Sequence, residues 1–214
     1  MFFLPLSLIL LILFILLLPV LFFFLHIQLA GAALTKLGIT PNMAILIILL
    51  CLIGSTINIP LMTRPVDPIE SVRCPFNYLG FPQLTGKQII AINVGGAIIP
   101  LLICLYLLPK APLGKVVIAT VICSLVVYKL ARPVPMVGIA VPVFIPPLVA
   151  ATLALLLSPR NPTPVAYISG VLGVLIGADL MNLNCLTSPG LMSIGGAGVF
   201  DGIFMVGIIS ALLG

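Results

Sequence analysis

The most constraining feature of the chain is a series of apolar runs that approach or exceed the roughly 20 residues an α-helix needs to cross a bilayer. Hydrophobic residues occupy 62% of the 214 positions and charged residues only 6%, against roughly 25% charged residues in ordinary soluble domains. A soluble fold could not bury this much apolar surface. We therefore predict a multi-pass integral membrane protein whose main partner is the lipid bilayer.

Seven hydrophobic segments can be separated along the chain. They cover residues 2–27, 41–61, 89–108, 113–131, 135–157, 164–183 and 194–213. Most are joined by short turns, and Thr40-Pro41-Asn42 is one such joint. The predicted fold class is all-α: a polytopic transmembrane helical bundle that forms a single integral membrane domain over residues 1–214. The first run lacks a basic start and exceeds the ~7–15 residue core of a cleaved signal, so we expect it to remain as a helix.

Two stretches depart from plain helices. Residues 62–88 are too long for a turn and rich in Pro, Gly and aromatic residues, so they form either an extramembrane surface connector or a folded cap. Arg132 to Pro147 contains five prolines, which remove backbone donors and disfavour an unbroken helix. We expect the fifth segment to be broken or re-entrant, with a kinked helix as the alternative.

Charge and metal-binding residues exclude several function classes. The net charge is +5, but the nine Lys and Arg residues stand singly between apolar runs, so nucleic-acid binding is not expected. The five cysteines show no CxxC spacing and His26 is the only histidine, so we predict no metal site and no cofactor. We expect His26 at the membrane interface, and Cys74 and Cys185 as free thiols, with a disulfide between them as the alternative.

The loops leave the membrane orientation open. Alternate loops hold five cations on one side and four on the other, which does not decide which side is cytoplasmic. The shortness of most loops suits a prokaryotic cell (inner) membrane.

Two acids stand inside apolar segments. Asp179 lies four residues before the end of the sixth segment, about 6 Å deep, and Asp201 lies seven residues into the seventh, about 10 Å deep. A short connector, Cys185 to Ser193, favours an antiparallel hairpin that would bring the two carboxyl groups to one site. The polar residues expected on the same side are Asn58, Asn93, Lys129, Arg132 and Asn182.

Acids in a membrane are costly and usually mark a pathway or a reaction centre. Asp179 and Asp201 are therefore the candidate functional residues, the structural alternative being an ion pair with Lys129 or Arg132. Two carboxyl groups within hydrogen-bond reach share a proton, so that one acts as base and the other as acid. In contrast, Asp67 and Glu70 stand among prolines and arginines of the long loop, where a solvated surface role is favoured.

The strings GADLMNLN, with Asp179, and GGAGVFDGIF, with Asp201, resemble intramembrane aspartyl proteases of the presenilin and signal peptide peptidase (GxGD) class. That class has a compact GxGD motif, whereas Val199 and Phe200 here separate the last glycine from the acid. The resemblance implies a catalytic Asp179/Asp201 dyad that hydrolyses peptide bonds of membrane-spanning substrates. The whole chain also resembles a prokaryotic polytopic membrane-protein family with an Asp-containing, glycine-rich last helix, a likeness that implies no activity.

Two other functions fit the same residues. In a proton- or cation-coupled transporter or channel the two aspartates would bind the ion, and broken helices would offer carbonyl groups to it. In a noncatalytic scaffold, glycine stripes on the sixth and seventh segments would mediate contacts with partner helices.

Overall fold

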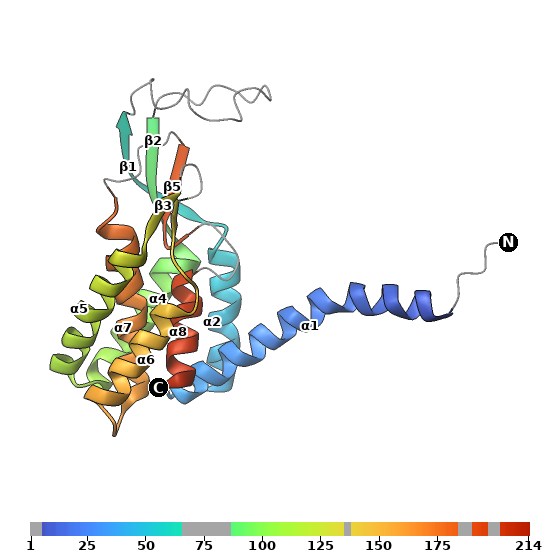
Figure 1. Ribbon diagram of the computed structural model, residues 1–214, viewed down its shortest axis with the longest axis horizontal. Coiled ribbons are helices and arrows are strands. Elements are labelled where there is room, and N and C mark those ends of the chain that lie inside the picture. Colours follow the sequence, from blue (N-terminus) through green and yellow to red (C-terminus); the bar gives the residue numbers. More distant parts are fainter. Residues whose placement is uncertain (1–5, 66–86, 135–137, 184–189, 197–201) are drawn as a thin grey trace.

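The computed structural model describes residues 6–65, 87–134, 138–183, 190–196 and 202–214, and most of them are helical (Figure 1). The α-helices are α1 (Leu6–Lys36), α2 (Pro41–Gly54), α4 (Ile99–Leu107), α5 (Leu113–Leu130), α6 (Ile145–Leu157), α7 (Pro162–Val174) and α8 (Gly202–Leu213). Two π-helices, η2 (Val94–Ile98) and η4 (Leu175–Leu180), precede α4 and follow α7, and a 3₁₀ turn, η3 (Leu108–Lys110), ends α4. Each α-helix overlaps one of the seven predicted hydrophobic segments, but α1 continues nine residues beyond the predicted end at residue 27.

Proline marks several of the helix starts. Pro41, Pro100, Pro146 and Pro162 each stand in the first turn of a helix, where the absent N–H costs no intrahelical bond. Gly38, with φ of 79°, turns the chain between α1 and α2. Local sequence therefore sets the joints of the bundle.

Among the described residues, three helices are long and apolar enough to cross a membrane: Leu10–Lys36, Leu113–Leu130 and Pro162–Leu180. Shorter apolar helices cover Pro41–Gly54, Val94–Lys110, Ile145–Leu157 and Gly202–Leu213. Large apolar side chains point outward; on α5, Val117, Val121 and Leu125 form an exposed row at intervals of four residues. An outward apolar face of this kind suits contact with lipid.

The all-α prediction is wrong in one respect, because a three-stranded sheet lies at one end of the bundle (Figure 1). Its strands are β1 (Asn58–Pro65), β2 (Lys87–Asn93) and β5 (Gly190–Ile194), in the order β1-β2-β5. β1 is antiparallel to β2, with Asn58 opposite Asn93, and β2 is parallel to β5, with Ile92 opposite Ile194. The sequence pattern of an apolar run of about five to eight residues does not distinguish a strand from a helix. Here these runs form strands because they pair with distant segments of the chain.

The proline-rich fifth segment is broken, as predicted, and the kinked-helix alternative is wrong. Its start forms β3 (Arg132–Val134) and β4 (Gly138–Ala140), which pair antiparallel. Helix α6 begins only at Ile145 and carries Pro146 and Pro147 in its first turn. Pro146 and Pro147 therefore stand where an intrahelical donor is not needed.

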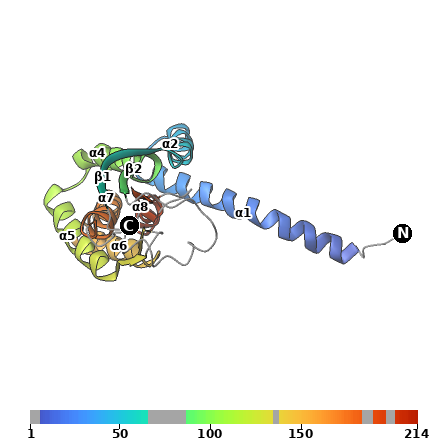
Figure 2. The same cartoon turned by 90° about the horizontal axis from the view of Figure 1, so that it is seen from above.

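The core of the bundle surrounds α7, which packs against α4, α5, α6 and α8 (Figure 2). Glycines let these helices approach closely. A β-carbon on Gly170 would lie 2.6 Å from Ser210 Oγ of α8, and one on Gly173 would lie 2.6 Å from Cys123 Sγ of α5. The glycines of α7 thus pack it on two sides.

Helix α1 runs away from the bundle and contacts it near its C-terminal end (Figures 1 and 2). Ala30, Ala33 and Leu34 are buried there, whereas Leu16 and Phe22 nearer the N-terminus are exposed. His26 contacts its own helix, with Nδ1 2.7 Å from the carbonyl oxygen of Phe22. Residues 66–86 of the predicted loop lie outside the described residues, and its ends belong to β1 and β2.

Candidate functional site

Asp179 stands in η4, where α7 reaches the sheet. Its side chain is partly buried, and its Oδ2 accepts a hydrogen bond from the backbone N–H of Gly195 at 2.9 Å. Short π-helical turns are frequent at functional sites because the extra residue re-aims a side chain. Asp179 is therefore directed at the segment that follows β5.

Gly195 can occupy its position only because it has no side chain. Its φ is +87°, and a β-carbon there would lie 2.6 Å from Cβ of Ala97 and 2.8 Å from its backbone nitrogen. Gly196 also has a positive φ, of 75°. Two consecutive left-handed residues turn the chain sharply after β5. This turn presents the Gly195 N–H to the carboxyl group.

The predicted ion-pair alternative for Asp179 is not found among the described residues. Lys129 and Arg132 are both exposed, and in the described parts of the chain the hydrogen bond from Gly195 is the polar contact of the Asp179 carboxyl group. Its Oδ1 has no hydrogen-bond partner within those same residues. Within the described part of the chain, Gly195 thus engages one of the two carboxyl oxygens.

Asp201 lies outside the described residues, so its predicted pairing with Asp179 stays a prediction. Gly202, the next residue, begins α8. Asp201 lies six positions after Gly195 in the sequence. The hydrogen-bonded partner of Asp179 therefore belongs to the short segment that leads to the second acid.

A buried polar network joins the elements around this site. Asn93, which is 1% exposed, donates through Nδ2 to the Ser55 carbonyl at 2.8 Å and to Asn58 Oδ1 at 3.1 Å. Its Oδ1 accepts from the N–H of Gly96 at 2.7 Å, and Ser193 Oγ donates to Asn58 Oδ1 at 2.6 Å. These bonds connect α2, β1, β2, η2 and β5. We call these five residues the asparagine network.

The predicted gathering of polar residues is confirmed in part. Asn58 and Asn93 meet, whereas Asn182 donates to the carbonyl groups of Gly177 and Ala178 and so caps its own helix. Ser55 and Ser193 were not predicted, because their roles depend on a carbonyl and a strand register set by the fold. Ser193 could have been singled out from the sequence, because it is a polar residue inside the apolar run Gly190–Ile194.

Glycine pairs follow the two neighbouring parallel strands. β2 leads directly into η2, whose second and third residues are Gly95 and Gly96, and β5 ends at Ile194 before Gly195 and Gly196. Gly95 packs directly on the backbone of α2 at Cys51 and Ser55. Close backbone contact therefore joins η2 to the end of α2.

Other polar groups lie deeper in the bundle. The hydroxyl groups of Thr120, Ser124, Tyr167 and Ser210 are buried without a hydrogen-bond partner among the described residues. Cys51, Cys104 and Cys123 are buried free thiols, while Cys74 and Cys185 lie outside the described ranges. Within those ranges no three His, Cys, Asp or Glu side chains are grouped so as to hold a metal ion.

Residues 52–213 match the family described as Protein of unknown function (DUF1614). The chain belongs to this family. The DUF1614 region begins near the end of α2 and extends into α8, so it contains the sheet, the asparagine network, Asp179 and Asp201. Helix α1 lies outside the DUF1614 match. No curated protein and no solved structure matches the chain.

Proposed function

We propose that all seven apolar segments lie in the bilayer of a prokaryotic cell (inner) membrane as one polytopic bundle. Three helices are long enough to cross a bilayer, which supports this proposal. The shorter apolar helices, which include α2, α6 and α8, pack in the same bundle as the long ones. Strands extend some of the short helices toward the membrane surface. Backbone of this kind is tolerated at membrane depth when it is paired or buried in protein.

Within that bundle we propose an intramembrane aspartyl protease that uses Asp179 and Asp201. The observation that carries the proposal is the Asp179 carboxyl group, held through Oδ2 by the N–H of Gly195 while Oδ1 has no partner among the described residues. The chain that supplies this N–H continues directly to Asp201. A carboxyl group that served packing alone would be expected to have both oxygens engaged.

The proposed chemistry is general acid–base hydrolysis. The ionised member of the dyad takes a proton from water as the water oxygen attacks the peptide carbonyl, and the protonated member hydrogen-bonds the carbonyl oxygen. Collapse of the tetrahedral intermediate breaks the C–N bond, and the leaving amine receives a proton. The low dielectric of the site would strengthen the coupling between the two carboxyl groups.

The test is cleavage of a reporter transmembrane peptide by purified protein in liposomes. Asp179→Asn and Asp201→Asn should each abolish cleavage, because an amide cannot transfer the proton. Asp67→Asn, in the loop between β1 and β2, is the matched control and should cleave at the wild-type rate. Normal cleavage by either dyad variant would rule out the protease.

An ion-coupled transporter or channel is the second candidate, and it rests on the breaks beside Asp179. The apolar segments that contain α2 and η2 change to strand at that end, as discontinuous helices do around ion sites. Ion flux into liposomes that is lost in both Asp→Asn variants, without peptide cleavage, would select this function. Full biological activity of both variants would select a scaffold.

A further inference from the structure

At the end of the bundle opposite the sheet, contacts join the ends of helices and the turns between them. We call this end of the bundle the base. Lys36 Nζ, at the end of α1, donates to the carbonyl of Leu212 in α8 at 3.0 Å. Asn161, before α7, donates through Nδ2 to the carbonyl of Lys110 in η3 at 3.0 Å. Lys110 Nζ in turn lies 3.8 Å from where a β-carbon of Gly38 would stand. Turns far apart in sequence are thus held side by side.

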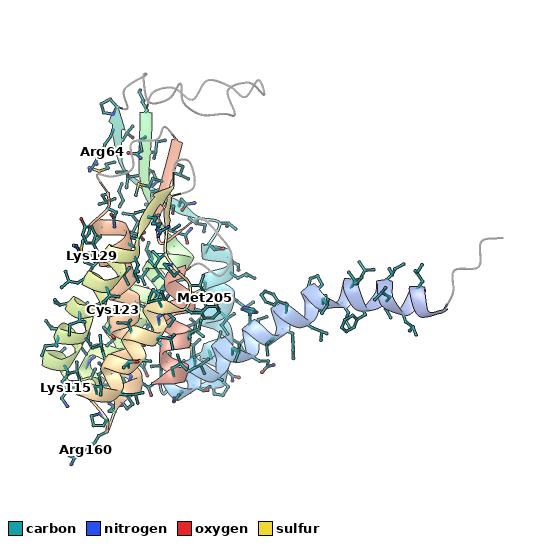
Figure 3. The ribbon with its side chains drawn as sticks, viewed as in Figure 1. Arg64, Lys115, Cys123, Lys129, Arg160 and Met205 are labelled. Atoms are coloured by element: carbon teal, nitrogen blue, oxygen red, sulfur yellow. The ribbon has the colours of Figure 1, made fainter. Side chains whose placement is uncertain are left out.

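These turns bring four cations to the base: Lys36, Lys110, Lys115 and Arg160. All four side chains are exposed. Figure 3 shows Lys115 and Arg160 at the foot of the bundle, with Arg64 and Lys129 toward the sheet. None of the four acids of the chain occurs in the turns that form the base. The turns that form the base therefore contain no acidic side chain to neutralise these four positive charges.

The sheet end has a different charge balance. It also carries cations, including Arg64 and Lys129, but Asp179 lies at that end. Asp67 and Glu70 follow β1 in the sequence, and Asp201 immediately precedes α8. The segments attached to the sheet thus contain both acidic and basic residues. The charged side chains in the turns of the base are all positive.

Exposed apolar side chains adjoin the cations of the base. Leu113 and Val117 stand two residues before and two residues after Lys115 in the first turns of α5, with 59% and 60% of their surface exposed. Leu156, four residues before Arg160 in the sequence, is 73% exposed. Tyr106 is also exposed, and its ring lies 3.8 Å below Lys110 Nζ. Aromatic residues next to cations are typical of the level at which headgroups meet acyl chains. The base thus offers charge to a headgroup and apolar surface to its chains.

We propose that the base binds the phosphate groups of anionic phospholipids in the adjacent leaflet. This inference rests on the proposed membrane placement, which puts these side chains at the level of the lipid phosphates. A lipid phosphate carries a fixed negative charge, and each nearby Lys or Arg adds to the attraction. The internal contacts of Lys36 and Lys110 keep these two side chains in place. Lys115 and Arg160, which have no polar partner among the described residues, are the groups free to follow a headgroup.

The experiment compares the binding of spin-labelled phosphatidylglycerol and phosphatidylcholine to the full chain reconstituted in phosphatidylcholine vesicles. The wild type should prefer the anionic lipid several-fold at low salt, and high salt should weaken the preference. Lys115→Gln/Arg160→Gln should lose most of it while keeping its helical circular dichroism, because neither side chain holds the base together. Lys36 and Lys110 are left unchanged because their side chains make contacts within the base.

The matched control is Lys129→Gln/Arg132→Gln, which removes the same two charges at the sheet end and should keep the preference. Equal binding of the two lipids by the wild type would overturn the proposal. So would an unchanged preference in Lys115→Gln/Arg160→Gln, or an equal loss in the control. Inorganic phosphate is added to separate vesicles of neutral lipid, and the thermal midpoint is measured. Stabilisation there by phosphate, without a lipid preference, would assign the base to a free anion instead.

Discussion

The Asp179 carboxyl group and the backbone N–H of Gly195 are joined by a 2.9 Å hydrogen bond between η4 and the turn after β5. The two residues are 16 positions apart, and the bond forms only because the chain at Gly195 adopts a left-handed conformation. This relationship makes the glycine, as well as the acid, a determinant of the site.

Gly195→Ala should destabilise the protein and misplace the carboxyl group. The left-handed φ costs a side-chain-bearing residue about 1–3 kcal/mol, and the added carbon would meet Ala97 at 2.6 Å. Thermal unfolding in detergent micelles measures the cost, and cleavage of the reporter peptide measures the loss of geometry. Gly190→Ala is the matched control, since its φ of +119° is also strained but its β-carbon would meet nothing within 4 Å. Equal destabilisation by the two variants would contradict the role of the Ala97 contact.

Asn93→Ala should loosen the junction of α2, η2 and the sheet. The substitution removes both donors and the acceptor that bond Ser55, Asn58 and Gly96, and each buried group left unpaired costs about 1–3 kcal/mol. We expect a loss of several kcal/mol in the free energy of unfolding, as measured by chemical denaturation in micelles. Asn161→Ala, which removes an exposed side-chain bond, should cost less than about 1.5 kcal/mol. Comparable losses would show that the asparagine network contributes little.

Gly177→Ala should separate α5 from η4, the π-helix that continues α7. A β-carbon at Gly177 would run into the carbonyl oxygen of Ser124, and overpacking in a close interface typically costs about 1–3 kcal/mol. A lower thermal midpoint is expected, with the helical content of the remaining native protein unchanged. Gly31→Ala in α1, where a β-carbon would meet nothing within 4 Å, should leave the midpoint unchanged or raise it. A fall of equal size in both variants would point to glycine flexibility instead of helix contact.

The helices could be predicted from the sequence, but the strands could not. The helices are predicted by the length of the apolar runs and by prolines in first turns, such as Pro41 and Pro162. At Asn58–Pro65, Pro60 disfavours a helix but does not by itself specify a strand, and at Lys87–Asn93 the apolar character fits either element. Pairing between these distant segments makes them strands. β5 is parallel to β2 across about 100 residues of sequence, a relationship that local patterns do not encode.

The site was predictable where polar residues interrupt apolar runs. Asp179, Asn58 and Asn93 stood out for that reason. The prediction that the two asparagines lie on the same side is confirmed, and they also share a hydrogen bond that was not predicted. The bond from Gly195 was not predictable, because its donor belongs to the backbone and its direction depends on packing against Ala97. Sequence therefore identified the acceptor side chain but not the backbone group that orients it.

Asp179→Asn and Asp179→Ala separate the structural role of this side chain from the proposed chemical one. Asparagine keeps an oxygen that can accept the N–H of Gly195, so its thermal midpoint should stay near the wild-type value. Alanine leaves that N–H without its partner, and we expect a loss of about 1–3 kcal/mol in the free energy of unfolding. Both variants should fail to cleave the reporter peptide, because neither has a carboxyl group to exchange a proton with water. Because the asparagine protein remains folded, its inactivity would be chemical in origin; retained cleavage in that folded variant would remove Asp179 from the catalytic dyad and leave it as an anchor for the turn at Gly195.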